Sequence, residues 1–384
     1  MEYLKNIKKS FKLKYSITYF VIIAFLVVTS LMSSSGDIKR STMGLLARIA
    51  YSIIMALSLN LVVGFLGELS LGHAGFMCIG AYIGCFCANL MHNVISSPLL
   101  VLILSMVIGA VSAALFGLII GLPALRLKGD YLAIVTLAFG EIVRNIFKNL
   151  PWFGGAMGLS TVTYPSESLF IVAFIVVIAV LFLCQNFIRS KHGRAVTAIR
   201  DNEIAAKAMG INVTFYKLLI FVISAAFAGV AGVIYGHFTT PVMYSFFSYN
   251  YSIEVLVMVV LGGMASLNGS IIAATLIPVI NFFLQDTLSG DLAALRLLIY
   301  AVILIVIVLF NNAPAFETVK EKFGFKKLHE KFAKHRKEST ITDDKAHWNK
   351  IQTKIPMDEV LSVDFRTEEA APSDDNYEKE NENG

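Results

Sequence analysis

The sequence predicts an all-α integral membrane protein, a polytopic transmembrane helix bundle of about ten membrane segments. Of its 384 residues, 56% are hydrophobic and 15% are charged, whereas soluble domains carry roughly 25% charged residues. The mean hydropathy is +0.70, and apolar runs recur at lengths near the ~20 residues that a helix needs to cross a bilayer. A large soluble core does not explain this composition, because too little polar surface remains to cover it.

The first apolar run, residues 15–32, follows a basic N-terminus, residues 1–14, in which five lysines stand against one acid. Ser-Ser-Ser-Gly comes next at 33–36. A secretory signal peptide with a small-residue cleavage site begins in the same way, so two interpretations are open. We favour an uncleaved first helix, because the run is about long enough to span a membrane.

Nine further apolar runs follow in the sequence. They occupy about 43–65, 69–91, 98–121, 130–148, 167–187, 218–238, 252–266, 270–286 and 293–311. Some are interrupted by glycine, and 252–266 is short for a span. Such segments either cross the membrane or are re-entrant, since broken helices are tolerated where they face protein or a water-filled path. The count of ten is therefore open by about two.

Basic residues cluster in alternate loops, which predicts the orientation. One short loop holds Arg126 and Lys128, and the loop 188–217 holds six bases, while 149–166, 239–251 and 287–292 contain no Lys or Arg. Ten spans that start inside place the loop at 126–128, the loop 188–217 and the Lys-rich tail on the cytoplasmic side, as the positive-inside rule requires. Both termini are then cytoplasmic. The net charge of +5 comes from these clusters, so we expect the bilayer and not nucleic acid as a partner.

We therefore divide the chain into the basic N-terminus, a transmembrane domain at 15–312 and a tail at 313–384. The tail is rich in Lys, Glu, Asp and Asn and poor in aromatics, which is typical of disorder. A basic amphipathic helix is possible near 317–337. The tail is either regulatory or passive, and we favour a passive tail.

No catalytic motif occurs in the sequence. The chain has no GxxxxGK[ST] phosphate loop and no Gly-Lys dipeptide, so it lacks that type of nucleotide site. Its four cysteines lie in apolar segments without metal-ligand spacing, which predicts buried free thiols. We expect no catalytic residue, no metal and no cofactor bound by this chain.

Glycine-rich stretches have two open interpretations, close helix packing and a broken helix that contacts a substrate. Gly80 and Gly84 have small-xxx-small spacing, which lets membrane helices approach closely, and Gly229, Gly232 and Gly236 mark another packing face. A helix break fits the stretch from Gly67 to Gly75 and the stretch 261–270. The candidates for such a break are Gly67, Glu68, His73, Gly75 and Asn268.

Glu141 and Arg144 are charged residues within a predicted span. Charged groups in a bilayer are costly and usually face the interior of the bundle, and the i,i+3 spacing lets these two pair on one helix face. The pair is either structural or part of a path through the bundle.

The stretch 192–213, HGRAVTAIRDNEIAAKAMGINV, predicts one or two short amphipathic helices on the cytoplasmic side. Val196 and Ile199 share one face, Asp201 or Asn202 can cap a second helix, and Gly210 can end it in the left-handed conformation. The apolar side of that second helix comprises Ile204, Ala205, Ala208 and Met209. Either these helices seat the bundle at the membrane interface or they dock a cytoplasmic partner.

Four ordered motifs carry a resemblance to a known family. They are GELSLGHAGFMCIGAY at 67–82, GDYLAIVTLAFGEIVRNI at 129–146, GRAVTAIRDNEIAAKAMGINVTFYKLLIFVISAAFAGVAGVIY at 193–235 and VLGGMASLNGS at 260–270. The chain resembles the permease family of branched-chain amino-acid ABC transporters over about 40–312. Its second motif is more like the M-type subunit than the H-type subunit.

The resemblance implies a multi-pass permease of the bacterial cytoplasmic membrane that imports leucine, isoleucine or valine by alternating access. It implies a heterodimer with a related H-type permease, two cytoplasmic ATPase subunits that use the ATP, and an extracytoplasmic substrate-binding protein. The ATPase-coupling loop of the family would correspond here to Gly193, Arg194, Arg200, Asp201, Asn202, Glu203, Ala206 and Gly210.

Three alternative functions stay open from the residues themselves. A related permease could carry urea, an amide or a sugar, because no side-chain pocket can be read from the sequence. An ion-coupled secondary transporter also uses broken helices, but it usually places carboxylates at mid-span, and these are few here. The third alternative is a membrane scaffold or receptor that carries no solute.

Overall fold

The computed structural model describes residues 19, 22, 40–95, 97–127, 129–162, 164, 166–287, 302 and 305. All of these belong to one compact unit, residues 1–311, and residues 312–384 form a second unit. The basic N-terminus, the tail at 313–384 and almost all of the runs 15–32 and 293–311 lie outside the described residues. Our expectations for those segments stay predictions.

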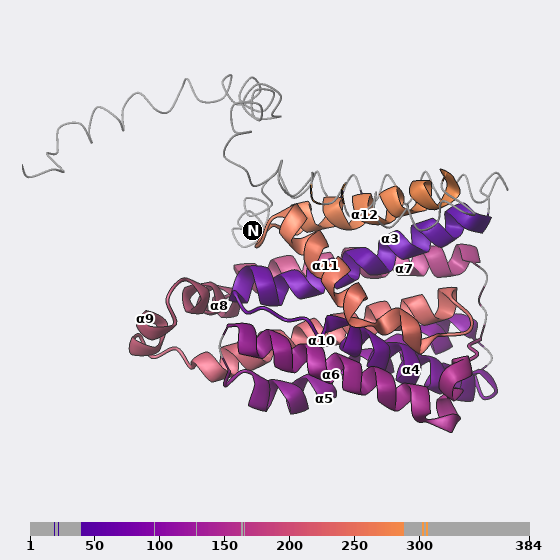
Figure 1. The fold of residues 1–384 in the computed structure, drawn as a ribbon, viewed down its shortest axis with the longest axis horizontal. Helices are drawn as coiled ribbons and strands as arrows, with labels where there is room; N and C mark the ends of the chain where they lie inside the picture. Colours follow the sequence, from indigo (N-terminus) through magenta and orange to yellow (C-terminus); the bar gives the residue numbers. More distant parts are fainter. Residues whose placement is uncertain are drawn as a thin grey trace, which may run out of the picture. The chain divides into compact units, whose positions relative to one another are not determined.

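The described residues form helices, with one isolated antiparallel bridge between Leu159 and Val242. The long helices are α3 (Arg40–Asn60), α4 (His73–His92), α5 (Pro98–Ala124), α6 (Asp130–Asn149), α7 (Ser166–Arg189), α10 (Val213–Phe238), α11 (Tyr249–Gly262) and α12 (Leu267–Thr287). The short elements are η1 (Leu61–Leu66), η2 (Pro151–Phe153), η3 (Gly155–Met157), α8 (Lys191–Asp201), α9 (Glu203–Ala208) and η4 (Tyr244–Phe247). Figure 1 shows α8 and α9 projecting at one end of the bundle.

Six helical segments among the described residues are long and apolar enough to cross a membrane. They are Thr42–Leu66, His73–His92, Pro98–Ala124, Ser168–Arg189, Val213–Phe238 and Leu267–Leu284. The run 130–148 forms α6, which carries four charged residues, and the run 252–266 forms α11, which has 14 residues. A helix of that length rises about 21 Å, less than the ~30 Å hydrocarbon core. The all-α membrane bundle is confirmed with six candidate spans, and the number ten stays a prediction.

A helix break separates α3 from α4. α3 continues into η1, a π-helix, and Gly67 then turns the chain at φ +81°. Residues 67–72 are not helical, and α4 begins at His73. A break in this glycine-rich stretch was one of the two interpretations that the sequence left open. The π-helix was not predicted, because its i→i+5 hydrogen bonds leave no periodic pattern in six consecutive residues of LVVGFL.

Glycines bring α10 into backbone contact with α4 and α5. A Cβ atom on Gly80 would overlap the backbone of Gly229, and one on Gly229 would overlap the carbonyl group of Gly109. A Cβ atom on Gly232 would likewise meet the backbone of Met77. Close packing is therefore the correct interpretation for Gly80, Gly229 and Gly232, and these helices form the centre of the fold.

Candidate functional site

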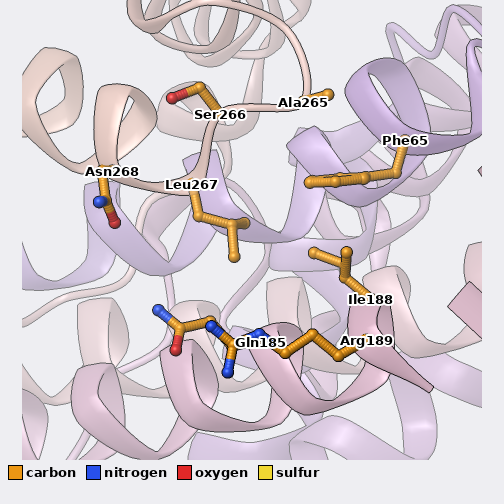
Figure 2. A pocket seen from close by; sticks show the side chains of 8 residues that line it. All are labelled: Phe65, Gln185, Ile188, Arg189, Ala265, Ser266, Leu267 and Asn268. Atoms are coloured by element: carbon orange, nitrogen blue, oxygen red, sulfur yellow. The ribbon is translucent and has the colours of Figure 1, made fainter. Parts of the chain in front are cut away.

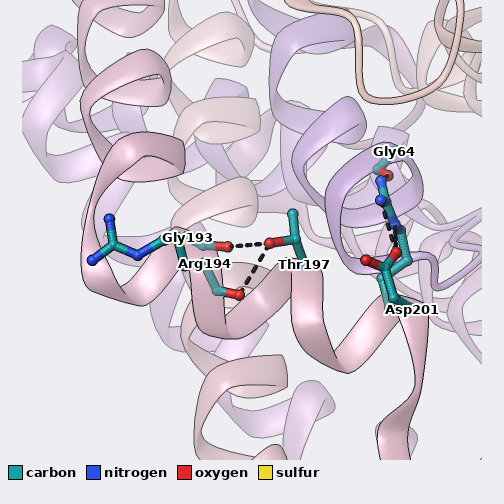
Figure 3. Close-up of polar contacts among 6 residues, drawn as sticks. Gly64, Gly193, Arg194, Thr197 and Asp201 are labelled. Atoms are coloured by element: carbon teal, nitrogen blue, oxygen red, sulfur yellow. Dashed lines mark hydrogen bonds and ion pairs between the residues drawn. The ribbon is translucent and has the colours of Figure 1, made fainter. Parts of the chain in front are cut away.

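Helix α8 folds back against the end of α7. The Ser190 hydroxyl caps α8 by accepting a hydrogen bond from the Gly193 amide at 3.2 Å. Gly193 has no room for a side chain, since a Cβ atom would overlap the carbonyl groups of Phe187 and Ile188. The Thr197 hydroxyl donates to the carbonyl groups of Gly193 and Arg194 (Figure 3). The predicted apolar face is confirmed, because Val196 and Ile199 are buried.

Helix α9 begins and ends as its sequence predicts. The Asn202 side chain caps it by accepting a hydrogen bond from the Ala205 amide at 3.0 Å. Gly210 follows its last turn at φ +82°, a left-handed conformation that costs other residues roughly 1–2 kcal/mol. Ala206 is buried against the rest of the chain, so this small residue is the point at which α9 rests on the bundle.

The apolar side of α9 faces away from the bundle. Ile204 is 81% exposed and Met209 is 83% exposed, and Ala205 and Ala208 between them are also exposed. We call these four residues the α9 surface. Helix α9 turns Ala206 inward and presents Ile204 and Met209 outward, where they can contact either the membrane interface or a cytoplasmic partner.

Arg200 attaches α8 to the helix break. Its Nη1 atom donates a hydrogen bond to the Gly64 carbonyl oxygen at 3.1 Å. Its Nε and Nη2 atoms both bind Asp201 Oδ1, at 3.0 and 2.9 Å, and Asp201 lies beside Gly64 in Figure 3. A Cβ atom on Gly67 would come within 2.8 Å of Arg200 Cγ. The predicted residues Gly67, Arg200 and Asp201 therefore meet at the end of η1.

Lys217 makes the second attachment, which the sequence pattern did not predict. Its Nζ atom lies 2.5 Å from Glu68 Oε1 and 3.2 Å from Glu203 Oε2. The Lys217 side chain is 5% exposed, so the cluster is largely shielded from solvent. Glu68 and Glu203 were predicted for different roles, and Lys217 joins them. A single lysine in the otherwise uncharged first turns of α10 is the sequence signal that could have indicated a partner.

The remaining loop candidate, Arg194, makes its polar contacts with neighbouring residues of α7 and α8, as far as the described part of the chain shows. Its Nη1 atom donates to the carbonyl oxygen of Arg189 at 3.3 Å, and the residue is exposed. It does not share the contacts of Arg200 or Lys217.

The Glu141–Arg144 pair lies on α6 and not at this site. The predicted pair forms, with Arg144 Nε donating to Glu141 Oε2 at 2.8 Å. Glu141 Oε1 also accepts a hydrogen bond from the Tyr249 amide at 3.0 Å. The pair therefore ties α6 to the start of α11.

His73 and Gly75 lie in the packed interior at the start of α4. His73 Nε2 is 2.8 Å from the Ser58 hydroxyl and 3.4 Å from the Ser224 hydroxyl. A Cβ atom on Gly75 would come within 2.8 Å of Gly140 Cα. These contacts join α4 to α3, α10 and α6. Asn268, at the start of α12, instead lines a cavity of about 270 Å³ with residues of η1 and α7.

Residues 41–308 match the family described as the branched-chain amino acid transport system / permease component. The chain belongs to this family. The high-affinity branched-chain amino acid transport system permease protein LivM of Salmonella typhimurium is 37% identical over 298 residues, which cover 69% of this chain and 67% of LivM. LivM of Escherichia coli is 34% identical over 282 residues, 65% of each chain. LivH of Salmonella typhimurium is 25% identical, over 62% of this chain and 83% of LivH.

The M-type resemblance is confirmed, since identity to the LivM proteins exceeds identity to LivH. The permease spans about two thirds of the length of its LivM relatives. As an ABC transporter permease component it is an integral membrane protein and a transport subunit, not an enzyme.

Proposed function

We propose that this permease forms the translocation path of an ATP-driven importer for leucine, isoleucine and valine, and that it works by alternating access. The family description and the names of the LivM relatives support this cargo. The protein would reside in the bacterial cytoplasmic membrane, with α8, α9 and both termini on the cytoplasmic side.

The proposed assembly contains four kinds of subunit. The chain is similar to both LivM and LivH, which supports pairing with a related H-type permease. Two cytoplasmic ATPase subunits would bind and hydrolyse ATP, so this chain needs no cofactor of its own. An extracytoplasmic binding protein would deliver the amino acid.

The proposal depends on the α9 surface and on the two attachments that Arg200 and Lys217 make between α8, α9 and the helix break. Ile204 and Met209 present exposed apolar side chains at the end of the bundle, as a docking element requires. Arg200 binds the η1 carbonyl of Gly64, and Lys217 binds both Glu203 of α9 and Glu68 of the helix break. A displacement of a docked ATPase would therefore act directly on the link between α3 and α4, which are two candidate spans.

The experiment is co-purification of the tagged permease in mild detergent with a variant that carries Ile204→Asp and Met209→Asp. We expect at least tenfold lower ATPase recovery, because two carboxylates would have to be buried in an apolar contact. Met157→Asp is the matched control, since Met157 is 85% exposed in η3, between α6 and α7. Equal ATPase recovery from the double variant and the control would contradict docking on α9.

The cargo is tested by uptake of labelled leucine into cells that contain all subunits. Unlabelled isoleucine and valine should compete, and urea and sugars should not. Uptake that persists after ATP depletion but disappears with the ion gradient would contradict an ABC importer.

A further inference from the structure

A cavity of about 270 Å³ lies at the same end of the bundle as α8. It is lined by Phe65 of η1, by the end of α7 and by the turn that leads into α12. Figure 2 shows Phe65 and Leu267 on one side and Gln185 and Arg189 on the other, with Asn268 beside them. Three elements far apart in sequence thus form one site.

A buried glutamine and a half-buried asparagine in this cavity have hydrogen-bonding atoms without a partner among the described residues. Gln185 is 6% exposed, and its Oε1 atom accepts a hydrogen bond from the Tyr19 hydroxyl at 2.9 Å. Its Nε2 atom, and Asn268 Oδ1, are buried with no hydrogen-bond partner within the described part of the chain. Because buried polar groups are nearly always hydrogen-bonded, these atoms indicate a polar ligand.

The lining groups match the three parts of an aliphatic amino acid. The Arg189 guanidinium and the Gln185 amide are donors suited to a carboxylate, and arginine recognises carboxylates through its fixed fork of N–H groups. Asn268 Oδ1 is an acceptor suited to an ammonium group. Phe65, Ile188 and Leu267 supply apolar surface for the side chain.

We propose that this cavity binds a free α-amino acid with an aliphatic side chain, and that the bound amino acid slows transport. The proposal rests on the proposed function in taking the amino acid to be imported cargo that has accumulated in the cytoplasm. It assigns a regulatory site to the permease in addition to the proposed transport role.

The cavity wall is continuous with the Arg200 attachment. Phe65 directly follows Gly64, whose carbonyl oxygen binds Arg200. A Cβ atom on Gly64 would overlap the backbone of Ala265, and the Ala265 amide is held by Asn60 Oδ1 at 3.0 Å. A ligand packed between Phe65 and Leu267 therefore holds η1 and the start of α12 in this arrangement. It can slow transport only by binding this arrangement more tightly than the alternative one.

The test is equilibrium binding of labelled leucine to the full chain in nanodiscs of zwitterionic lipid. We expect leucine to bind to the parent chain, and we expect the Gln185→Leu variant to bind leucine at least tenfold more weakly. Isoamylamine, which lacks the carboxylate, and 4-methylpentanoate, which lacks the ammonium group, should each compete at least tenfold more weakly than leucine. Asn145→Leu, a change of an exposed amide on α6, is the matched control and should bind as the parent does.

A second variant guards against misfolding of Gln185→Leu. Arg189 is exposed at the rim of the cavity, so the Arg189→Gln variant should keep the fold intact. It should also bind leucine at least tenfold more weakly than the parent chain. No leucine binding by the parent chain, or equal binding by both variants and the parent, would overturn the inference. Displacement of labelled leucine by inorganic phosphate or by anionic lipid as effectively as by unlabelled leucine would assign the cavity to anions and also overturn the inference.

Regulation is tested in vesicles that contain the complete importer and are loaded with leucine on the α8 side. The parent importer should slow as internal leucine rises, and the Gln185→Leu importer should not. ATP-driven uptake without internal inhibition would overturn this inference alone. Leucine binding to the nanodiscs without any ATP-driven uptake would overturn the proposed function alone.

Discussion

Arg200 and Gly64 are separated by 136 positions in the chain, yet Arg200 Nη1 lies 3.1 Å from the Gly64 carbonyl oxygen. This hydrogen bond joins the predicted coupling loop to a π-helix at the end of the first candidate span. It exists because η1 leaves carbonyl groups without a helical partner at its end, and because Gly67 leaves space for the Arg200 side chain.

Replacing Arg200 should uncouple transport from ATP hydrolysis. Arg200→Gln removes the bonds to Gly64 and Asp201, so movement of α8 would no longer reach η1. We expect at least a tenfold loss of leucine uptake per ATP hydrolysed by the reconstituted complex. Lys191→Gln, which changes an exposed base on the same helix, should retain the parent ratio. If the Arg200→Gln and Lys191→Gln variants take up the same amount of leucine per ATP hydrolysed, Arg200 has no role in coupling.

Replacing Lys217 should reduce stability as well as transport. Lys217→Met leaves Glu68 and Glu203 without their shared cation, and loss of one partner from a buried ion pair costs about 3 kcal/mol or more. Thermal melting in mild detergent should show this loss, while Lys207→Met, an exposed lysine of α9, should melt with the parent. If both variants melt together, the Lys217 cluster does not stabilise the fold.

Gly210→Val should uncouple transport through the backbone. Gly210 has φ +82°, and a Cβ atom added there would meet nothing within 4 Å, so the effect is conformational and not a steric clash. A β-branched residue is strongly disfavoured at such a φ. The end of α9 would shift, and uptake should fall at least tenfold at equal protein levels. Normal uptake in membranes that hold normal amounts of the variant would contradict a coupling role.

Gly229→Ala should destabilise the centre of the bundle. The added methyl group would overlap the Gly109 carbonyl group, and overpacking of this kind costs about 1–3 kcal/mol. Gly44→Ala is the control, because Gly44 is also helical and nothing lies within 4 Å of its Cβ position. That change should stabilise the protein slightly, by up to about 1 kcal/mol from helix propensity. Lower or equal melting of Gly44→Ala relative to Gly229→Ala would contradict the packing argument.

Local features of this protein were predictable from its sequence. Apolar runs predicted the long helices, and the cap at Asn202 and the stop at Gly210 are encoded within a few neighbouring residues. The i,i+3 spacing likewise predicted the Glu141–Arg144 pair. Each of these depends on groups that are close in the chain, so a single sequence carries the information.

Long-range relationships were not predictable in the same way. The partners of Lys217 lie 149 and 14 positions away, and nothing in the local pattern names them. The sequence also did not show which side of α9 rests on the bundle, because a six-residue helix can present either side. Tertiary packing of Ala206 decides that orientation.

The backbone contacts around Gly229 determine how the permease can move. Helices whose main chains touch cannot slide or rotate past one another without a clash, so α4, α5 and α10 should travel as a single rigid body. Residues 67–72 join this body to α3 and η1 without helical hydrogen bonding. If the permease works by the proposed alternating access, we expect the two parts of the bundle to tilt about that linker, which Lys217 binds and Arg200 adjoins.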